Sequence, residues 1–206
     1  AYTAVDRAES EPARALAVNA EGARHLAQAC EAAGIPLFHV STDYVFDGSK
    51  PQPWCVDDAT VPLGVYGASK LAGEQAVRAA CRRHLVLRTS WVFGAHGNNF
   101  VRTMVRLAAT RDELRVVADQ YGGPTWTGDL ARELLALAAR HAAGEPLPWG
   151  TGHYAGAPAT SWCGFARVIL DEAVAAGLLP RAVPVRAIGT ADYPTSARRP
   201  ANSVLD

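Results

Sequence analysis

A tyrosine and a lysine lie four residues apart in the segment Val65-Tyr66-Gly67-Ala68-Ser69-Lys70. The segment resembles the start of a helix, on which side chains four residues apart share one face. A phenol titrates at about pH 10, and a neighbouring positive charge favours its ionised form and lowers its pKa. Such a pair can protonate an oxygen while a carbonyl group is reduced. The alternative is a solvated lysine beside a half-buried ring, which is common on ordinary helices.

Lysine is rare in this chain. Of its 20 basic residues only Lys50 and Lys70 are lysines, and the others are arginines. A compact ammonium with a tunable pKa is not interchangeable with a guanidinium. The use of lysine at position 70 therefore favours the chemical interpretation of the pair.

Polar residues follow a short apolar run at 35–40. This run reads as a buried strand of a parallel sheet, and Ser41, Thr42 and Asp43 come directly after it. Ligands of open α/β sheets bind outside the carboxyl ends of the strands, so chemistry is expected at these three residues. The alternative is that their side chains only cap the backbone of the loop.

Helices and strands alternate along the rest of the chain. Helical patterns run from Ser10 to Gly34, from Tyr66 to about Arg83, after Asn99, after Thr127 and from Trp162 to about Gly177, with strands at 84–89, 114–117, 153–155 and 183–188. Caps are expected at Ser10 and Thr127 and within the segments 97–99 and 160–161. Helices between strands imply βαβ connections, and the end of the 84–89 strand leads to Trp91. Asn19 lies within the first helical run and needs hydrogen-bond partners if it is buried.

The composition is that of an ordinary soluble globular protein: 206 residues, 49% hydrophobic, with a net charge of zero. No basic cluster with interleaved aromatic residues indicates nucleic-acid binding, and no apolar run approaches the ~18 residues that a membrane span needs. No leader is recognised, so we expect a cytoplasmic location. The four cysteines are far apart and the histidines are scattered, so no metal site is predicted.

Seven blocks along the chain resemble one family. They are AYTAVDRAESE (1–11), STDYVFDG (41–48), YGASKLAGE (66–74), RTSWVFG (88–94), NNFVRTM (98–104), DQYGGPTW (119–126) and ARRPANSVLD (197–206). Thr42, Tyr66 and Lys70 match the Ser/Thr and Tyr-x-x-x-Lys arrangement of the extended short-chain dehydrogenase/reductase superfamily. Together the blocks resemble the dTDP-4-dehydrorhamnose reductase family.

The resemblance implies a reaction. Hydride passes from NADPH or NADH to the C4 ketone of a dTDP-4-dehydro-6-deoxyhexose, converting dTDP-4-dehydrorhamnose to dTDP-rhamnose in nucleotide-sugar biosynthesis. Tyr66 is the implied general acid, Lys70 binds the nicotinamide ribose, and Thr42 tunes the tyrosine. The implied substrate contacts are Thr42, Asp43, Trp91 and Val5, and the implied cofactor contacts are Ala1, Tyr2, Thr3, Tyr66 and Lys70.

The implied fold is α/β, a Rossmann-like doubly wound parallel sheet with a small C-terminal α/β substrate lobe. Residues 1–118 are the expected remainder of the dinucleotide-binding domain, and residues 119–206 are mainly the lobe, interleaved with that domain. No G-x-G-x-x-G turn opens the chain. We therefore expect a fragment that lacks the N-terminal strands and glycine-rich segment. Such a fragment exposes a sheet edge, binds nicotinamide cofactor poorly and has little activity alone.

Other functions stay open at this point. A non-catalytic regulatory subunit of the same fold is one, although Thr42 and Trp91 argue against it. Another nucleotide-sugar 4-ketoreductase or an epimerase is a second, whereas Asp43-Tyr44 in place of an Asp-Glu pair disfavours a dehydratase. The family allows a homodimer and, in some members, Mg²⁺ at a subunit contact, which nothing in this sequence specifies. Arg198 and Arg199 are candidates for a diphosphate contact or for a surface ion pair.

Overall fold

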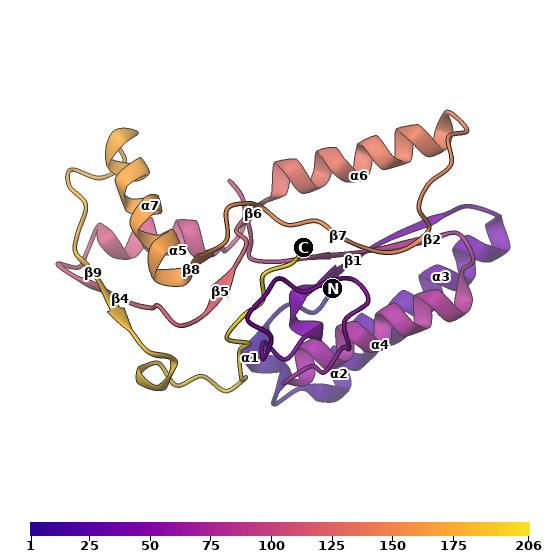
Figure 1. Cartoon of the computed structure of the whole chain (residues 1–206), viewed down its shortest axis with the longest axis horizontal. Coiled ribbons are helices and arrows are strands. Elements are labelled where there is room, and N and C mark those ends of the chain that lie inside the picture. Colours follow the sequence, from indigo (N-terminus) through magenta and orange to yellow (C-terminus); the bar gives the residue numbers. More distant parts are fainter.

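A three-stranded parallel sheet lies at the centre of the computed structural model, which describes residues 1–206. Its strand order is β1 (Leu37–Thr42), β2 (His84–Thr89) and β7 (Gly150–His153). Thr42 is paired with Thr89, so the carboxyl ends of β1 and β2 lie side by side. Helices cover both faces, with α3 and α4 on one side and α6 on the other (Figure 1). The predicted α/β fold with parallel strands is confirmed.

The first helical run is one continuous helix with a wider turn inside it. It comprises α2 (Pro12–Leu16), a π-helical turn (Ala17–Glu21) and α3 (Gly22–Ala33), and it ends at Gly34 in the left-handed conformation (φ 68°). The predicted N-cap Ser10 is wrong. Its hydroxyl instead donates to the carbonyl of Arg7 in the short helix α1 (Val5–Ala8), and Glu11 precedes the first turn of α2.

Helix α4 (Val65–Ala80) packs against both α3 and the sheet. Small and apolar side chains fill this interface: Ala23, Ala27, Val77, Cys81 and Val86. On the opposite face α6 (Thr127–Ala142) contributes Leu137, which packs against Leu85 of β2. The predicted cap Thr127 is wrong, because it is already the first helical residue and its side chain lies against Gly94.

A second layer has its own core. It is built from α5 (Phe100–Ala108), α7 (Trp162–Ala175) and the parallel pair β4 (Leu114–Val117) and β9 (Val185–Ile188). Twelve buried side chains form its core, from Met104 to Val183. Asn99 and Ser161 cap α5 and α7 through their side chains, as predicted. These elements come from both sides of residue 118, and the division at that residue stays a prediction.

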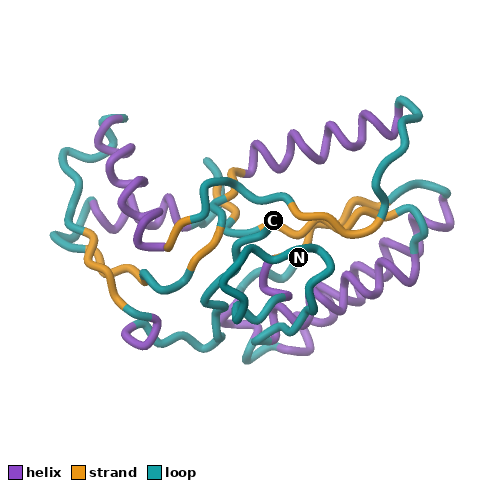
Figure 2. Tube along the Cα trace, in the orientation of Figure 1, coloured by secondary structure: helices purple, strands orange, loops and turns teal.

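Short strand pairs and long connections join the two layers. β3 (Val92–Phe93) pairs with β6 (Thr125–Trp126), and β5 (Tyr121–Gly122) pairs with β8 (Thr160–Ser161). The last residues return to the sheet as an extended segment, which Figure 2 shows as loop, with bridges from Trp54 to Leu205 and from Tyr121 to Asn202. Single-turn 3₁₀ helices occur at Asp43–Val45 and Thr190–Asp192. None of the helices has the length and apolar character needed to cross a membrane.

Candidate active site at the end of the central sheet

Buried polar groups gather where β1 ends. Thr42 and Asp43 are only 5% and 2% exposed. The hydroxyl of Thr42 donates to Oδ1 of Asp43 at 3.0 Å and accepts from the backbone N–H of Tyr44 at 3.2 Å. Because a hydroxyl has one proton, donation from Thr42 to any further acceptor competes with its donation to Asp43.

Tyr66, in the first turn of α4, lies next to this strand end. Its ring packs edge-on against Tyr44, with ring centroids 5.7 Å apart at 77°. A side chain at Gly67 would overlap the carbonyl of Tyr44, so the helix approaches the strand end this closely because residue 67 is a glycine. Val5 lines a small pocket together with Tyr44 and Tyr66. The structure therefore brings Val5 and Tyr66 to one pocket and Thr42 and Asp43 to the adjoining strand end.

The electrostatics of Tyr66 differ from the sequence expectation. Burial raises its pKa to about 12; the Thr42 hydroxyl lowers the pKa, and the Asp43 carboxylate adds to the rise. The expected lowering by Lys70 is wrong for this structure. The Lys70 ammonium donates to the carbonyl of Val40 at 2.7 Å, and burial lowers the pKa of Lys70. Desolvation thus outweighs the charge of the lysine.

Asp43 is a buried carboxyl group with spare hydrogen-bonding capacity. Burial raises its pKa to about 7, against the opposing effect of the nearby Ser203 and Thr42 hydroxyls. Its Oδ2 atom is buried without a partner. A carboxyl group in this state accepts or releases a proton near neutral pH at the edge of the site.

Asn19 ties the N-terminal residues to α4. Its Oδ1 accepts from the N–H of Tyr2 at 2.8 Å, and its Nδ2 donates to Tyr2 O at 3.0 Å and to Ser69 Oγ at 2.9 Å. Tyr2 is half-buried, whereas Ala1 and Thr3 are exposed. The π-helical turn carries Asn19, and an asparagine inside an apolar helical run was the one sequence signal for this contact.

Trp91 follows β2 but lies outside the Tyr66 cluster. It has a left-handed backbone (φ 47°), which is strained for a bulky residue and marks functional sites. Its indole stacks on Trp162, with centroids 3.5 Å apart at 7°, and covers Gly122, where a side chain would overlap the ring. The stack connects Trp162, the first residue of α7, with the end of β2.

A pocket of about 320 Å³ lies on the second layer beside this stack. Apolar side chains form much of its lining, including Phe100, Met104 and Trp162, and it is also lined by Arg111, Arg115, Arg199, Gln120 and Tyr193. Arg199 makes a bidentate ion pair with Asp6, with N–O distances of 2.6 and 2.9 Å. Arg198 is exposed. The ion-pair interpretation therefore holds for Arg199, although its position on the pocket also places it near any ligand there.

Comparison with known proteins decides the family. The model of the RmlD substrate binding domain matches residues 1–206. The dTDP-4-dehydrorhamnose reductase of Aggregatibacter actinomycetemcomitans is 50% identical over 206 residues, which are the whole of this chain and 70% of that protein. The chain belongs to the dTDP-4-dehydrorhamnose reductase family. The family predicted from the seven sequence blocks is thus confirmed. The chain is therefore a member of a family of oxidoreductases.

Solved structures of the family agree. A crystal structure of the dTDP-4-dehydrorhamnose reductase from Bacillus anthracis in complex with NADP superposes with a TM-score of 0.91 at 39% identity, covering all of this chain and 69% of that one. The corresponding protein from Clostridium acetobutylicum gives a TM-score of 0.90 over the same shares. The arrangement of layers described above is therefore that of the reductase family.

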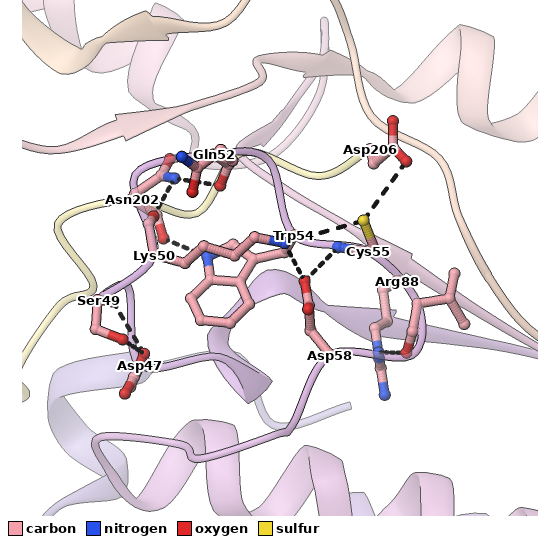
Figure 3. Close-up of polar contacts among 11 residues, drawn as sticks. Asp47, Ser49, Lys50, Gln52, Trp54, Cys55, Asp58, Arg88, Asn202 and Asp206 are labelled. Atoms are coloured by element: carbon pink, nitrogen blue, oxygen red, sulfur yellow. Dashed lines mark hydrogen bonds and ion pairs between the residues drawn. The ribbon is translucent and has the colours of Figure 1, made fainter.

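The C-terminal segment, residues 197–206, lies against the loop at residues 47–58, which follows the end of β1. Trp54 donates its indole N–H to Asn202 O at 2.9 Å, and Asn202 donates its amide to Lys50 O at 2.7 Å (Figure 3). Lys50 pairs with Asp58 at 2.6 Å. The block at 197–206 is thus bound to the 47–58 loop. No group of three or more His, Cys, Asp or Glu side chains is arranged to hold a metal ion, and all four cysteines are free.

Proposed function

We propose that this chain carries the site at which the C4 ketone of a dTDP-4-dehydro-6-deoxyhexose is reduced, in the step from dTDP-4-dehydrorhamnose to dTDP-rhamnose. The observation that supports it most strongly is the convergence of Thr42, at the end of β1, with Tyr66, in the first turn of α4. The buried ammonium of Lys70 lies one turn further along the same helix. On this proposal the central sheet is part of a doubly wound Rossmann-like domain, and residues 119–206 supply most of the substrate lobe.

Tyr66 is the proposed general acid. Its pKa of about 12 keeps the phenol protonated at neutral pH, so a proton is available for the alkoxide that forms when the ketone is reduced. Thr42 is the proposed tuning group, because its hydroxyl lowers the pKa of Tyr66. Val5 lines a small pocket with Tyr66, and Asp43 accepts from Thr42; these two residues are the proposed sugar contacts.

The nicotinamide end of the cofactor fits residues at this edge. Lys70 offers a buried ammonium, and Tyr2 is held beside α4 by Asn19, so Ala1, Tyr2, Thr3, Tyr66 and Lys70 would bind NADPH or NADH there. The bound cofactor supplies the hydride. The Bacillus anthracis relative was crystallised with NADP, which favours NADPH.

Cofactor affinity of the 206-residue chain itself is a separate prediction. The chain has no G-x-G-x-x-G turn to hold the pyrophosphate. We expect calorimetry to give a dissociation constant for NADPH weaker than about 100 μM, since the nicotinamide end alone provides few contacts. Micromolar binding would contradict this expectation and would show that other groups of the chain hold the phosphates.

The pocket on the second layer is the proposed site of the nucleotide. Its aromatic residues offer stacking surfaces for a base, and its arginines offer charge for a diphosphate. Trp162 lines this pocket and stacks on Trp91, so the two tryptophans connect the nucleotide pocket with the end of β2. This contact supports Trp91 as a substrate-binding residue.

The test of the proposal is a Tyr66→Phe substitution with Tyr44→Phe as its matched control, since the two rings touch each other. Both are made in a chimaera in which this chain replaces the matching 206 residues of the Aggregatibacter reductase. We expect Tyr66→Phe to lower kcat by about 10²–10⁴-fold and to leave dTDP binding within twofold. Tyr44→Phe keeps most of the turnover. A chimaera that binds dTDP but turns over no keto sugar would instead favour the non-catalytic subunit.

Finer points of the proposal follow from the family alone. Four expectations stay predictions: the specificity of another nucleotide-sugar 4-ketoreductase or of an epimerase, a homodimer, Mg²⁺ dependence and a cytoplasmic location. Comparing turnover of dTDP-4-dehydrorhamnose with that of its C4- and C5-isomers, with and without Mg²⁺, tests the first and third of them.

A further inference from the structure

A buried carboxylate that the proposed reaction does not use lies one helical turn beyond Lys70. Glu74 is 0% exposed and binds side chains from three elements. Both of its oxygens accept from Arg88 of β2, at 3.0 and 2.9 Å, and Oε1 also accepts from Ser41 of β1 at 2.6 Å. Oε2 accepts from Arg78, further along α4, at 2.6 Å. Every lone-pair direction of this carboxylate is thus engaged.

These partners are neighbours in sequence of the residues in the proposed site. Ser41 precedes Thr42 directly, and Arg88 stands three residues before Trp91. Arg88 is itself 2% exposed, packs over the ring of Phe46 at 5.1 Å and donates to the carbonyl of Val56 at 3.3 Å (Figure 3). The Glu74–Arg88 pair therefore joins α4 to the ends of both strands and to the loop beyond them.

The charge of Glu74 also acts on Lys70. Burial lowers the pKa of Lys70, and the Glu74 carboxylate acts against that lowering. His39 of β1 is a titratable group near this lysine. Burial lowers the pKa of His39 to about 4, the charge of Lys70 lowers it further, Glu74 acts against this, and the N-terminal amino group adds to the lowering. At neutral pH His39 is therefore uncharged, and Glu74 is the acidic group that supports the Lys70 ammonium.

We propose that Glu74 is a positioning residue of the reductase: it fixes the position of α4 against the ends of β1 and β2, and it places a negative charge one helical turn from the Lys70 ammonium. The inference rests on the proposed role of Lys70, but its test does not depend on turnover. A buried ion pair contributes little net stability compared with an apolar pair of the same volume, so stability alone gives no reason for one here. Control of the position and charge of a neighbouring group does.

The chain itself offers a direct readout because Lys50 and Lys70 are its only lysines. Selective ¹³C labelling of lysine gives two Cε signals, which titrate separately in NMR. In Glu74→Gln we expect the deprotonation constant of Lys70 to rise at least about threefold, because a neutral amide replaces the carboxylate while Arg78 and Arg88 stay positive. Lys50, which pairs with Asp58, serves as the internal reference and keeps its midpoint.

Glu31→Gln is the matched control, since it removes the same charge from an exposed ion pair with Arg82. It leaves both lysine signals unchanged. Should Glu74→Gln fail to fold, Glu74→Met combined with Arg88→Met removes both buried charges at similar volume and keeps the core filled. We then expect a folded chain whose Lys70 deprotonation constant still rises relative to that of the unaltered chain, because Glu74, and not Arg88, is the charge that acts on Lys70. A folded variant of either kind with an unchanged Lys70 midpoint overturns the proposal, whatever Tyr66→Phe does to turnover.

Discussion

The end of the central sheet is held together by buried polar groups, whereas the second layer is held together by hydrophobic packing. At the sheet end, buried polar groups bind one another: Ser41, Thr42, Asp43, Glu74 and Arg88 are all at most 5% exposed. The second layer has a core of twelve buried side chains, all of them hydrophobic, with further aromatic rings packed against it. At the sheet end, hydrogen bonds fix the orientation of the side chains. In the second layer, close packing of apolar side chains fills the core.

The difference matches the two tasks of the proposed reaction. Proton transfer requires donors and acceptors within tenths of an ångström of a set geometry, which hydrogen-bonded and charged partners impose. Holding a base and a diphosphate requires an apolar surface with a few cations at its edge. The stacked Trp91–Trp162 pair, which lies between the regions, is where the two kinds of construction meet.

Asp43→Asn tests the polar region and carries the largest expected effect on stability. Burial raises the pKa of Asp43 to about 7, above its ordinary value, so the folded chain binds its proton more tightly than the unfolded chain. Stability is therefore lost as pH rises from about 4 to about 7, and the loss is constant above that. An asparagine does not titrate. We expect the variant to gain up to about 4 kcal/mol over the unaltered chain at pH 7.5 and nothing at pH 4, by urea unfolding.

Asp58→Asn is the control for that titration, because the contribution of Asp58 to stability changes with pH in the opposite direction. A hydrogen bond from Lys50 lowers the pKa of Asp58, so its contribution is present near neutral pH and is lost as pH falls through its folded pKa. The difference between Asp58→Asn and the unaltered chain should therefore shrink towards acid pH. An Asp43→Asn difference that is flat with pH would show that Asp43 is ionised throughout, and the polar region would then be wetter than it appears.

Leu170→Ala tests the apolar region with a somewhat smaller effect. Leu170 is 1% exposed in α7, and truncation leaves a cavity that costs about 3 kcal/mol. Val168→Ala on the same helix is the control, because Val168 is 58% exposed and its truncation costs less than about 0.5 kcal/mol. Hydrogen exchange should show faster opening of α7 and β9 with β1 and β2 unaffected. Equal acceleration in both regions would mean that the chain unfolds as one unit.

The sequence predicted the elements better than the contacts between them. The strand at 84–89, the strand at 114–117 and the Asn99 and Ser161 caps are confirmed, because their signals are local. The family resemblance implied that Thr42 acts on Tyr66, and in the structure the Thr42 hydroxyl does affect the pKa of that phenol; the catalytic roles of both residues stay predictions. Periodicity carries no information on which buried side chain meets which, so neither Glu74 nor its partner Arg88 was identified.

Two errors have one physical cause. The pKa of Tyr66 and the partner of Lys70 were inferred from spacing on a helix, which gives proximity along one element only. In the structure desolvation dominates the pKa of Tyr66, and the Lys70 ammonium is taken by the carbonyl of Val40 on a different element. Both effects depend on how α4 packs on β1, and a pattern within α4 does not contain that information.

Gly122→Ala tests the junction between the regions and carries the smallest expected effect. A methyl group at Gly122 would overlap the indole of Trp91, which is stacked on Trp162 and cannot move away without breaking that stack. We expect a loss of about 1–2 kcal/mol in stability, weaker dTDP binding and a reduced exciton signal of the tryptophan pair in near-ultraviolet circular dichroism. Gly152→Ala is the control, since its methyl group would meet only Leu87 at 3.7 Å, an ordinary contact. If Gly122→Ala weakened the exciton signal but left dTDP binding intact, the junction would be packing alone, and Trp91 would no longer connect the nucleotide pocket with the sheet end.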